Sequence, residues 1–194
     1  MRHRYELANE GTQRKNKLTA ICDELFPELT LVFKNPNLPI ALDLREKFST
    51  PQAVATASLV ALREVRKRNY PSESQLLLLQ QLAAQSIGTK NLARQRSLLL
   101  EQGLLIKELR LIQGHMEQLD MEIAQIVEQS REGHILLSIP PVSPMYAAAI
   151  LATIVHIANF EDAGHLKSYF GWAPRRAQTG ISFAPLEPHE RRLP

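Results

Sequence analysis

The chain has 194 residues, of which 44% are hydrophobic and only 6% aromatic, and its formal net charge is +3. This length suits one ordinary domain or two small ones, and the excess of Leu, Ile and Ala over aromatic residues favours packed helices over a β-sandwich. The single cysteine, Cys22, excludes an internal disulfide and a cysteine-rich metal cluster, so a reducing, cytoplasmic setting is expected. No apolar run reaches the length of a membrane span, and the polar N-terminus does not resemble a signal peptide.

The first 48 residues are expected to be helical with one break. Apolar residues recur near a 3.6-residue period over 5–34, which predicts a helix. Two prolines within 35–39 remove backbone donors and end that helix. A short helix over 40–47 is expected to follow.

Residues 49–132 are expected to form a second helical region. A hydroxyl residue before Pro51 predicts the start of a helix over 51–68. After a turn, Ser72 or its neighbour Ser74 can cap the next helix. The remainder, about 75–131, reads as one long helix or as two helices with a joint near Gly88.

The second half of this region carries a heptad pattern. Its apolar residues follow spacings of 4, 3, 4, 3, 4 and 3: Leu105, Leu109, Ile112, Met116, Leu119, Ile123 and Ile126. Leu98 extends the pattern backwards, with Gln102 as a polar interruption. Such a seam predicts a coiled coil, and its short length favours an antiparallel partner within the same chain, supplied by 75–87 or 51–68.

Residues 133–183 are expected to form a small C-terminal domain. A turn rich in proline, Pro140 to Pro144, precedes a nearly all-apolar helix over 146–157, which we expect to be buried in a core. A further helix is expected over about 162–170. Residues 184–194 contain three prolines and no periodicity, which predicts a disordered tail.

The proline turn separates two helices in the way that a DNA-binding hairpin does. In such hairpins glycines let backbone N–H groups approach a phosphate, whereas this chain has Pro141 and Ser143 at those positions. An ordinary helix–helix turn is the alternative interpretation.

An aromatic and basic run follows, from Tyr169 to Arg176. It interleaves stacking surfaces with cations, a combination that suits single-stranded or distorted nucleic acid. The alternative is that Phe170 and Trp172 anchor a core. Downstream of this run, Thr179 precedes a glycine, so its hydroxyl is a candidate nucleophile for a phosphodiester.

Basic residues recur in clusters along the chain, and we assign nucleic-acid contact to nine of them. These are Arg14, Lys15, Lys17, Arg66, Lys67, Arg68, Lys167, Arg175 and Arg176. Clusters with few acids between their members can bind phosphates, while the alternative for each is an ordinary solvated helix face.

Three carboxylate pairs were considered as Mg²⁺ ligands: Asp23 with Glu24, Asp43 with Glu46, and Glu161 with Asp162. Adjacent acids point to different faces of a helix, and the remaining pair has basic neighbours. The histidines show no ligand spacing. We therefore expect neither a metal site nor a cofactor in this chain.

The C-terminal blocks resemble a known family. IPPVSP, AAAILATI, ANF and LKSYFGWAPRRAQTG are similar to the C-terminal domain of the IS one-ten family of insertion-sequence transposases, which are DEDD enzymes guided by a bridge RNA. The upstream blocks RKNKL and AICDELFPEL, and the long helix after them, also resemble that family. The similarity extends to Phe183.

The resemblance implies a layout of three parts: a RuvC-like domain with four metal-binding acids, a helical coiled coil, and a small C-terminal domain. In that last domain a serine before a glycine attacks DNA, and its position corresponds to Thr179. Mg²⁺ is implied for the intact enzyme. Residues 1–48 then correspond to a remnant that follows the RuvC-like domain, and 133–183 to an incomplete helix-hairpin-helix-like domain.

Together these observations predict an all-α protein with a long coiled-coil helical hairpin and a small helix-hairpin-helix-like domain. The expected function is that of a transposase fragment, truncated at both ends and inactive alone, with DNA and a guide RNA as partners. The alternative is a non-catalytic nucleic-acid-binding module. It would self-associate, or pair with a full-length transposase, through the seam.

Overall fold

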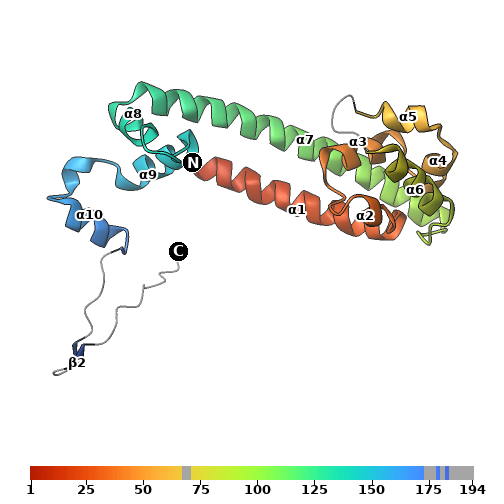
Figure 1. Ribbon diagram of the computed structural model, residues 1–194, viewed down its shortest axis with the longest axis horizontal. Coiled ribbons are helices and arrows are strands. Elements are labelled where there is room, and N and C mark those ends of the chain that lie inside the picture. Colours follow the sequence, from red (N-terminus) through yellow and green to blue (C-terminus); the bar gives the residue numbers. More distant parts are fainter. Residues whose placement is uncertain (67–70, 173–177, 180–181, 184–194) are drawn as a thin grey trace. The chain divides into compact units, whose positions relative to one another are not determined.

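A computed structural model describes residues 1–66, 71–172, 178–179 and 182–183. Within these residues the fold is all-α, as predicted, and the strands β1 (Gln178–Thr179) and β2 (Ser182–Phe183) are only two residues long (Figure 1). The chain divides into two compact units, Met1–Gln125 (unit 1) and Ile126–Pro194 (unit 2). The predicted tail, 184–194, lies outside the described residues.

The described residues of unit 1 form two long helices and five short ones. They are α1 (Arg2–Leu25), α2 (Leu29–Val32), α3 (Pro39–Lys47), α4 (Pro51–Thr56), α5 (Leu59–Arg63), α6 (Glu73–Ala84) and α7 (Leu92–Gln129), whose last residues pass into unit 2. Of the two alternatives for the chain after residue 75, the break near Gly88 is the one observed. In the described part of the chain no helix is long and apolar enough to cross a membrane.

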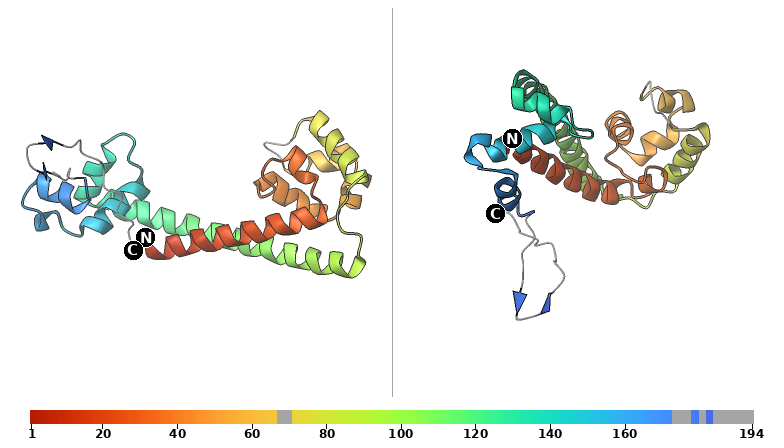
Figure 2. Two further views of the ribbon diagram at one scale, coloured as in Figure 1. Left: turned by 90° about the horizontal axis from the view of Figure 1, so that it is seen from below. Right: turned by 60° about the vertical axis from the view of Figure 1, so that its left-hand side comes forward.

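The two long helices, α1 and α7, lie side by side and antiparallel (Figures 1 and 2). Near one end of the pair Arg94 binds Glu24 at 2.6 Å, and near the other Arg4 binds Asp120. Apolar residues fill the space between: Leu18, Ile21, Leu25, Leu98, Leu105, Ile106 and Leu109 are buried in one cluster. Each such side chain contributes on the order of 1.5–3 kcal/mol when fully buried.

The heptad seam therefore has a partner in its own chain, but not the predicted one. The expectation that 75–87 or 51–68 would cover it is wrong, because α1 does so. Periodicity identifies the face of a helix that is buried and leaves open which element buries it. The start of the seam is buried at Leu105, whereas Ile126 at its end is 65% exposed. Self-association through the covered half would have to displace α1.

The short helices pack around a second core at one end of α1. Its buried members are Cys22, Phe26, Leu29, Phe33, Ala41, Leu44, Val54, Leu62, Leu76, Leu79 and Ala83. Ser72 caps α6 with a capping box, as predicted. The predicted helix over 51–68 is instead two helices, since Ser58 caps α5 through the Ala61 N–H at 3.1 Å. The predicted helix over 5–34 also divides, at Phe26 before Pro27.

A buried arginine joins three elements of unit 1. Arg45 of α3 is 4% exposed and donates to the Leu18 carbonyl at 2.8 Å, the Pro36 carbonyl at 3.2 Å and Gln102 Oε1 at 2.9 Å. Gln102 in turn donates to the Arg45 carbonyl at 3.3 Å. Burial lowers the pKa of the Arg45 guanidinium. The polar interruption of the heptad is thus the acceptor that a buried cation needs.

Unit 2 begins inside α7 and continues through short helices. They are α8 (Arg131–Leu137), α9 (Pro144–Ile154), the 3-10 turn η1 (Ile157–Asn159) and α10 (Ala163–Tyr169). The long helix ends at Gln129, slightly before the predicted end near 131, and Ser130 then caps α8 through the Gly133 N–H. A Cβ on Gly133 would lie 1.9 Å from the Val127 carbonyl oxygen, so only glycine fits this tight helix junction.

Candidate nucleic-acid interface

The C-terminal end of α10 places an aromatic side chain by a helix-capping turn. Gly171 has φ of 73° and donates to the Ser168 carbonyl at 3.0 Å, while the Trp172 N–H donates to the Lys167 carbonyl at 2.8 Å. This pair of bonds is the Schellman motif, which requires a residue in the left-handed region and so favours glycine. The turn reverses the chain and brings the Trp172 ring against Phe170.

Four aromatic rings, from α10 and the residues on either side of it, form a continuous chain. Phe160 meets Tyr169 edge to face at 5.3 Å, Tyr169 meets Phe170 at 5.7 Å, and Phe170 stacks on Trp172 at 5.0 Å with 22° between the planes. His165 also contacts the Phe160 ring edge to face at 5.8 Å. These separations are those of favourable aromatic pairs.

The rings lie largely in solvent. Trp172 is 73% exposed and Tyr169 57% exposed, while Phe170 is partly covered. The alternative that Trp172 anchors a core is therefore wrong among the described residues. Rings that stack on each other while facing water present a flat apolar surface, which suits the face of a nucleobase.

The all-apolar helix α9 is less buried than predicted. Only Ala147 and Ala148 are fully buried, so the expectation of a core helix is wrong for the described residues. With α8 it lines an apolar groove of about 790 Å³, whose wall includes Ile135, Leu151 and Val155.

The groove wall contains a strained turn. Val155 has φ of 62° and is bridged by a hydrogen bond of 2.8 Å from the His156 N–H to the Ile154 carbonyl. A positive φ is unfavourable for a β-branched residue. The strain lies beside the groove, on the C-terminal side of α9.

The predicted cations of unit 1 fall into two groups. Arg14 binds Glu108 at 3.2 Å, and Arg66 binds Asp43 at 3.2 Å, so both have intramolecular partners. Lys15 and Lys17 are exposed on α1, and among the described residues their ammonium groups form no ion pair. Lys15 and Lys17 are therefore the better phosphate ligands of this group.

The remaining predicted residues belong to unit 2 or lie outside the described residues. Lys167 is exposed on α10, the helix that carries the aromatic rings. Thr179 pairs with Ser182 across the β1–β2 ladder, which places its backbone in a short hairpin. Four further predicted cations lie outside the described residues: Lys67, Arg68, Arg175 and Arg176.

Four of the six candidate metal carboxylates have other partners. Asp43 and Glu46 both accept from Arg110, at 2.8 Å and 2.6 Å. Glu24 binds Arg94, whose hydrogen bond lowers the pKa of the carboxyl. Asp162 caps α10, in the region where a helix start was predicted. Across the described ranges no three metal-ligating side chains come together.

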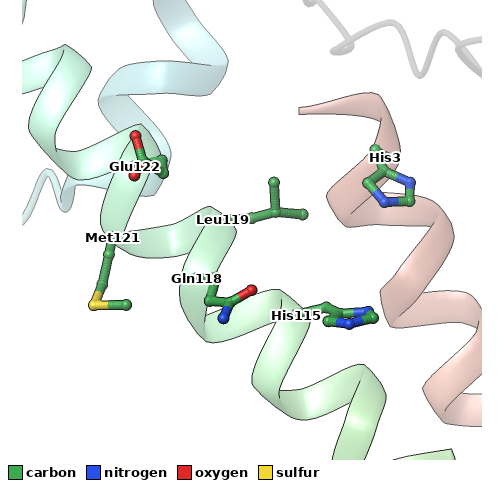
Figure 3. Close-up of a pocket in the computed structure, with 6 residues that line it drawn as sticks. All are labelled: His3, His115, Gln118, Leu119, Met121 and Glu122. Atoms are coloured by element: carbon green, nitrogen blue, oxygen red, sulfur yellow. The ribbon is translucent and has the colours of Figure 1, made fainter.

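A shallow hollow of about 580 Å³ lies between the first turn of α1 and α7. Figure 3 shows His3 on α1 and His115 and Leu119 on α7 reaching into the space between the two helices. His3 lies 3.6 Å from Glu6, a contact that becomes an ion pair only when the imidazole is protonated. Glu122 also lines the hollow, but in the described part of the chain no three metal-ligating side chains come together, so the hollow is a poor site for a metal.

Sequence reasoning missed two members of the aromatic surface, Phe160 and His165. Their spacing from Tyr169, nine and four residues, does not match one regular helix face, because Phe160 precedes α10 in a non-helical segment. Asp162 is the available signal: an N-cap residue there fixes the start of the helix and hence which residues fold back on it.

The comparisons with known proteins now bear on this site. Residues 133–189 match the model of the Transposase IS116/IS110/IS902 family. The match covers the segment that contains the aromatic rings, Lys167 and Thr179.

A curated relative is similar to most of the chain. It is an insertion element IS110 uncharacterized 43.6 kDa protein from Streptomyces coelicolor, 26% identical over 179 residues. The alignment covers 91% of this chain and 44% of the relative, so the chain spans less than half the length of that protein. No solved structure matches the chain.

Proposed function

We propose that this chain is a DNA-binding helical part of an IS110-type transposase and acts in DNA strand cleavage and transfer. The observation that carries the proposal is the family match over 133–189, which includes the exposed aromatic surface of α10. The cations of unit 1 support it, because exposed lysines on α1 can neutralise phosphates.

Within this proposal the residues have separate roles. Lys15 and Lys17 contact the phosphate backbone, and Lys167 does so beside the aromatic rings. Thr179 stands where the family has its serine nucleophile. Its hydroxyl can attack a phosphodiester, although its extra methyl group hinders the approach. Arg14 and Arg66 contribute less, since binding DNA would break their ion pairs.

Strand cleavage in this family depends on Mg²⁺ bound by acidic residues, and the carboxylates of the described residues do not fit that requirement. Asp43 and Glu46 bind Arg110, and Asp162 caps a helix. We therefore assign no metal-dependent step to this chain. The purified chain is expected to bind DNA without cutting it.

The test combines binding with cleavage. The chain is mixed with a fluorescent DNA duplex and with supercoiled plasmid, in Mg²⁺, and compared with the Thr179→Ala and Thr179→Ser variants. We expect anisotropy to rise on binding, the rise to weaken with salt, and the plasmid to stay intact in all three proteins. Nicking that Thr179→Ala abolishes and Thr179→Ser retains would contradict the inactive-alone proposal. An absence of binding at low salt would contradict DNA binding itself.

A further inference from the structure

The aromatic surface of unit 2 is formed by Phe160, Tyr169, Phe170 and Trp172, and the Trp172 ring has a face open to water. Trp172 stacks on Phe170 at 5.0 Å, which covers one side of the indole, yet the residue is 73% exposed. The other side is therefore open to water. Tyr169 continues the surface, with its ring against Phe170 at 5.7 Å and 57% of the residue exposed.

This surface is held in place by the backbone rather than by a core. The Schellman turn at Gly171 fixes the start of the Trp172 side chain. The Tyr169 hydroxyl donates to the Thr153 carbonyl at 3.3 Å, which ties α10 to α9. A surface arranged before binding loses less conformational entropy when a ligand stacks on it.

The charge around the surface argues against recognition by phosphate contacts alone. Between Ile126 and Trp172 the sequence has four acids and two cations: Glu128, Glu132, Glu161, Asp162, Arg131 and Lys167. The next two charged residues in the sequence, Arg175 and Arg176, only balance that count. A patch without a cationic surplus attracts the phosphates of a duplex weakly, so stacking has to supply most of the binding.

We propose that Tyr169, Phe170 and Trp172 form a stacking platform for unpaired bases of single-stranded DNA. In a duplex the faces of the bases are covered by their neighbours, whereas unpaired bases offer them to an aromatic ring. This inference rests on the proposed function and specifies that the DNA bound by unit 2 is single-stranded. Stacking tolerates any base, so the platform selects strand state rather than sequence.

The experiment uses the one tryptophan of the chain as its reporter. The whole chain is titrated with oligothymidylate, with an abasic oligomer of equal length and charge, and with a duplex, while Trp172 fluorescence is followed. We expect oligothymidylate to quench the emission and the abasic oligomer to leave it unchanged. The duplex is expected to quench less than the single strand at equal nucleotide concentration.

Variants separate stacking from folding. Trp172→Leu and Tyr169→Leu should each weaken oligothymidylate binding about ten-fold in anisotropy, a loss typical of one stacked base. Trp172→Phe keeps an aromatic face and should bind within a few-fold of the wild type. Tyr146→Leu is the matched control, because it removes an exposed tyrosine of α9 that lies outside the platform. Circular dichroism checks that each variant is folded.

The outcomes distinguish this inference from the proposed function. Equal binding of abasic and base-bearing strands, with unquenched emission, would overturn the platform and leave DNA binding intact. Quenching by oligouridylate but not by oligothymidylate would overturn the assignment to DNA and indicate RNA. Binding of no nucleic acid at all would overturn the proposed function as well.

Discussion

The buried contact between Arg45 and Gln102 predicts that Gln102→Leu destabilises the protein, which is the opposite of what the heptad pattern alone predicts. Gln102 interrupts an apolar heptad, so the pattern alone predicts that Gln102→Leu would stabilise the seam. In the structure both side chains are buried, at 4% and 3% exposure, and Gln102 Oε1 accepts the Arg45 Nε–H at 2.9 Å. Leucine would leave this charged donor buried without an acceptor.

The magnitude follows from two opposing terms. Leaving a buried charged N–H without its acceptor costs about 3 kcal/mol, the upper end of the range for a neutral group. Leucine recovers only about 1–2 kcal/mol, because the glutamine stem at this position is already buried. We therefore expect Gln102→Leu to lower the free energy of unfolding by about 2 kcal/mol. The double variant Arg45→Met with Gln102→Leu should lose less stability than the two single variants summed, because neither side chain is then left without the other, although the Leu18 and Pro36 carbonyls still lose a donor.

Cys22 provides an assay specific to unit 1. It is the only cysteine, it lies in the unit 1 core, and burial raises the pKa of its thiol to about 11, so it reacts when the unit opens. Thiol labelling in a urea series measures the free energy of opening for each variant. Gln113→Leu, an exposed glutamine on the same helix, is the control and should change it by less than about 0.5 kcal/mol. A neutral or stabilising Gln102→Leu would refute the reasoning.

Three further predictions follow from the described contacts. Gly11→Ala should stabilise unit 1 by about 1 kcal/mol, because the added Cβ would make ordinary contacts of 3.6–3.8 Å. Gly133→Ala should destabilise unit 2, because its Cβ would lie 1.9 Å from a carbonyl oxygen. Urea unfolding measures both changes, and equal effects would contradict this reasoning. For Glu28, burial opposes ionisation, but bonds from the Ile87 N–H and the Ser86 hydroxyl lower the pKa. Its stabilisation is therefore full above the unfolded pKa of 4.5 and is lost as pH falls through the lower folded pKa. The loss of stability in Glu28→Gln should thus be largest near pH 7 and shrink as pH falls below 4.5, and a loss that does not change with pH would exclude this. Lys15→Ala should weaken DNA binding without changing stability, whereas Arg14→Ala should reduce stability more than DNA binding. DNA titration and thermal melting of both variants measure this, and the opposite pattern of effects would contradict it.

Local signals in the sequence predicted much of unit 1. Residues close to one another in the chain determine several of its features: the caps at Thr50 and Ser72, the break over 35–39 and the buried face of α7. The α1 partner of the seam was not predicted, because any amphipathic helix could satisfy the same apolar face. The burial of Arg45 was not predicted either, because a cation with acidic and basic neighbours in the sequence is expected to be solvated.

In unit 2 the sequence indicated the right residues and the wrong environment. The all-apolar composition of α9 predicted a core helix, but a helix buries only as much surface as its neighbours can cover, and α8 covers one side. The sequence alone is compatible with Trp172 in a core or in a stacking surface. The turn at Gly171, which depends on a positive φ at one residue, decides that the ring faces solvent.

The central claim, that this chain binds DNA through exposed cations and aromatic rings, is tested most directly by the salt dependence of binding. A labelled single strand is titrated with the whole chain at several salt concentrations, alongside a variant that carries Lys15→Ala and Lys17→Ala. We expect measurable affinity at low salt and a logarithmic slope that falls by about 0.7 for each phosphate contact removed. Absence of binding at low salt, or a slope that the double substitution leaves unchanged, would contradict the account.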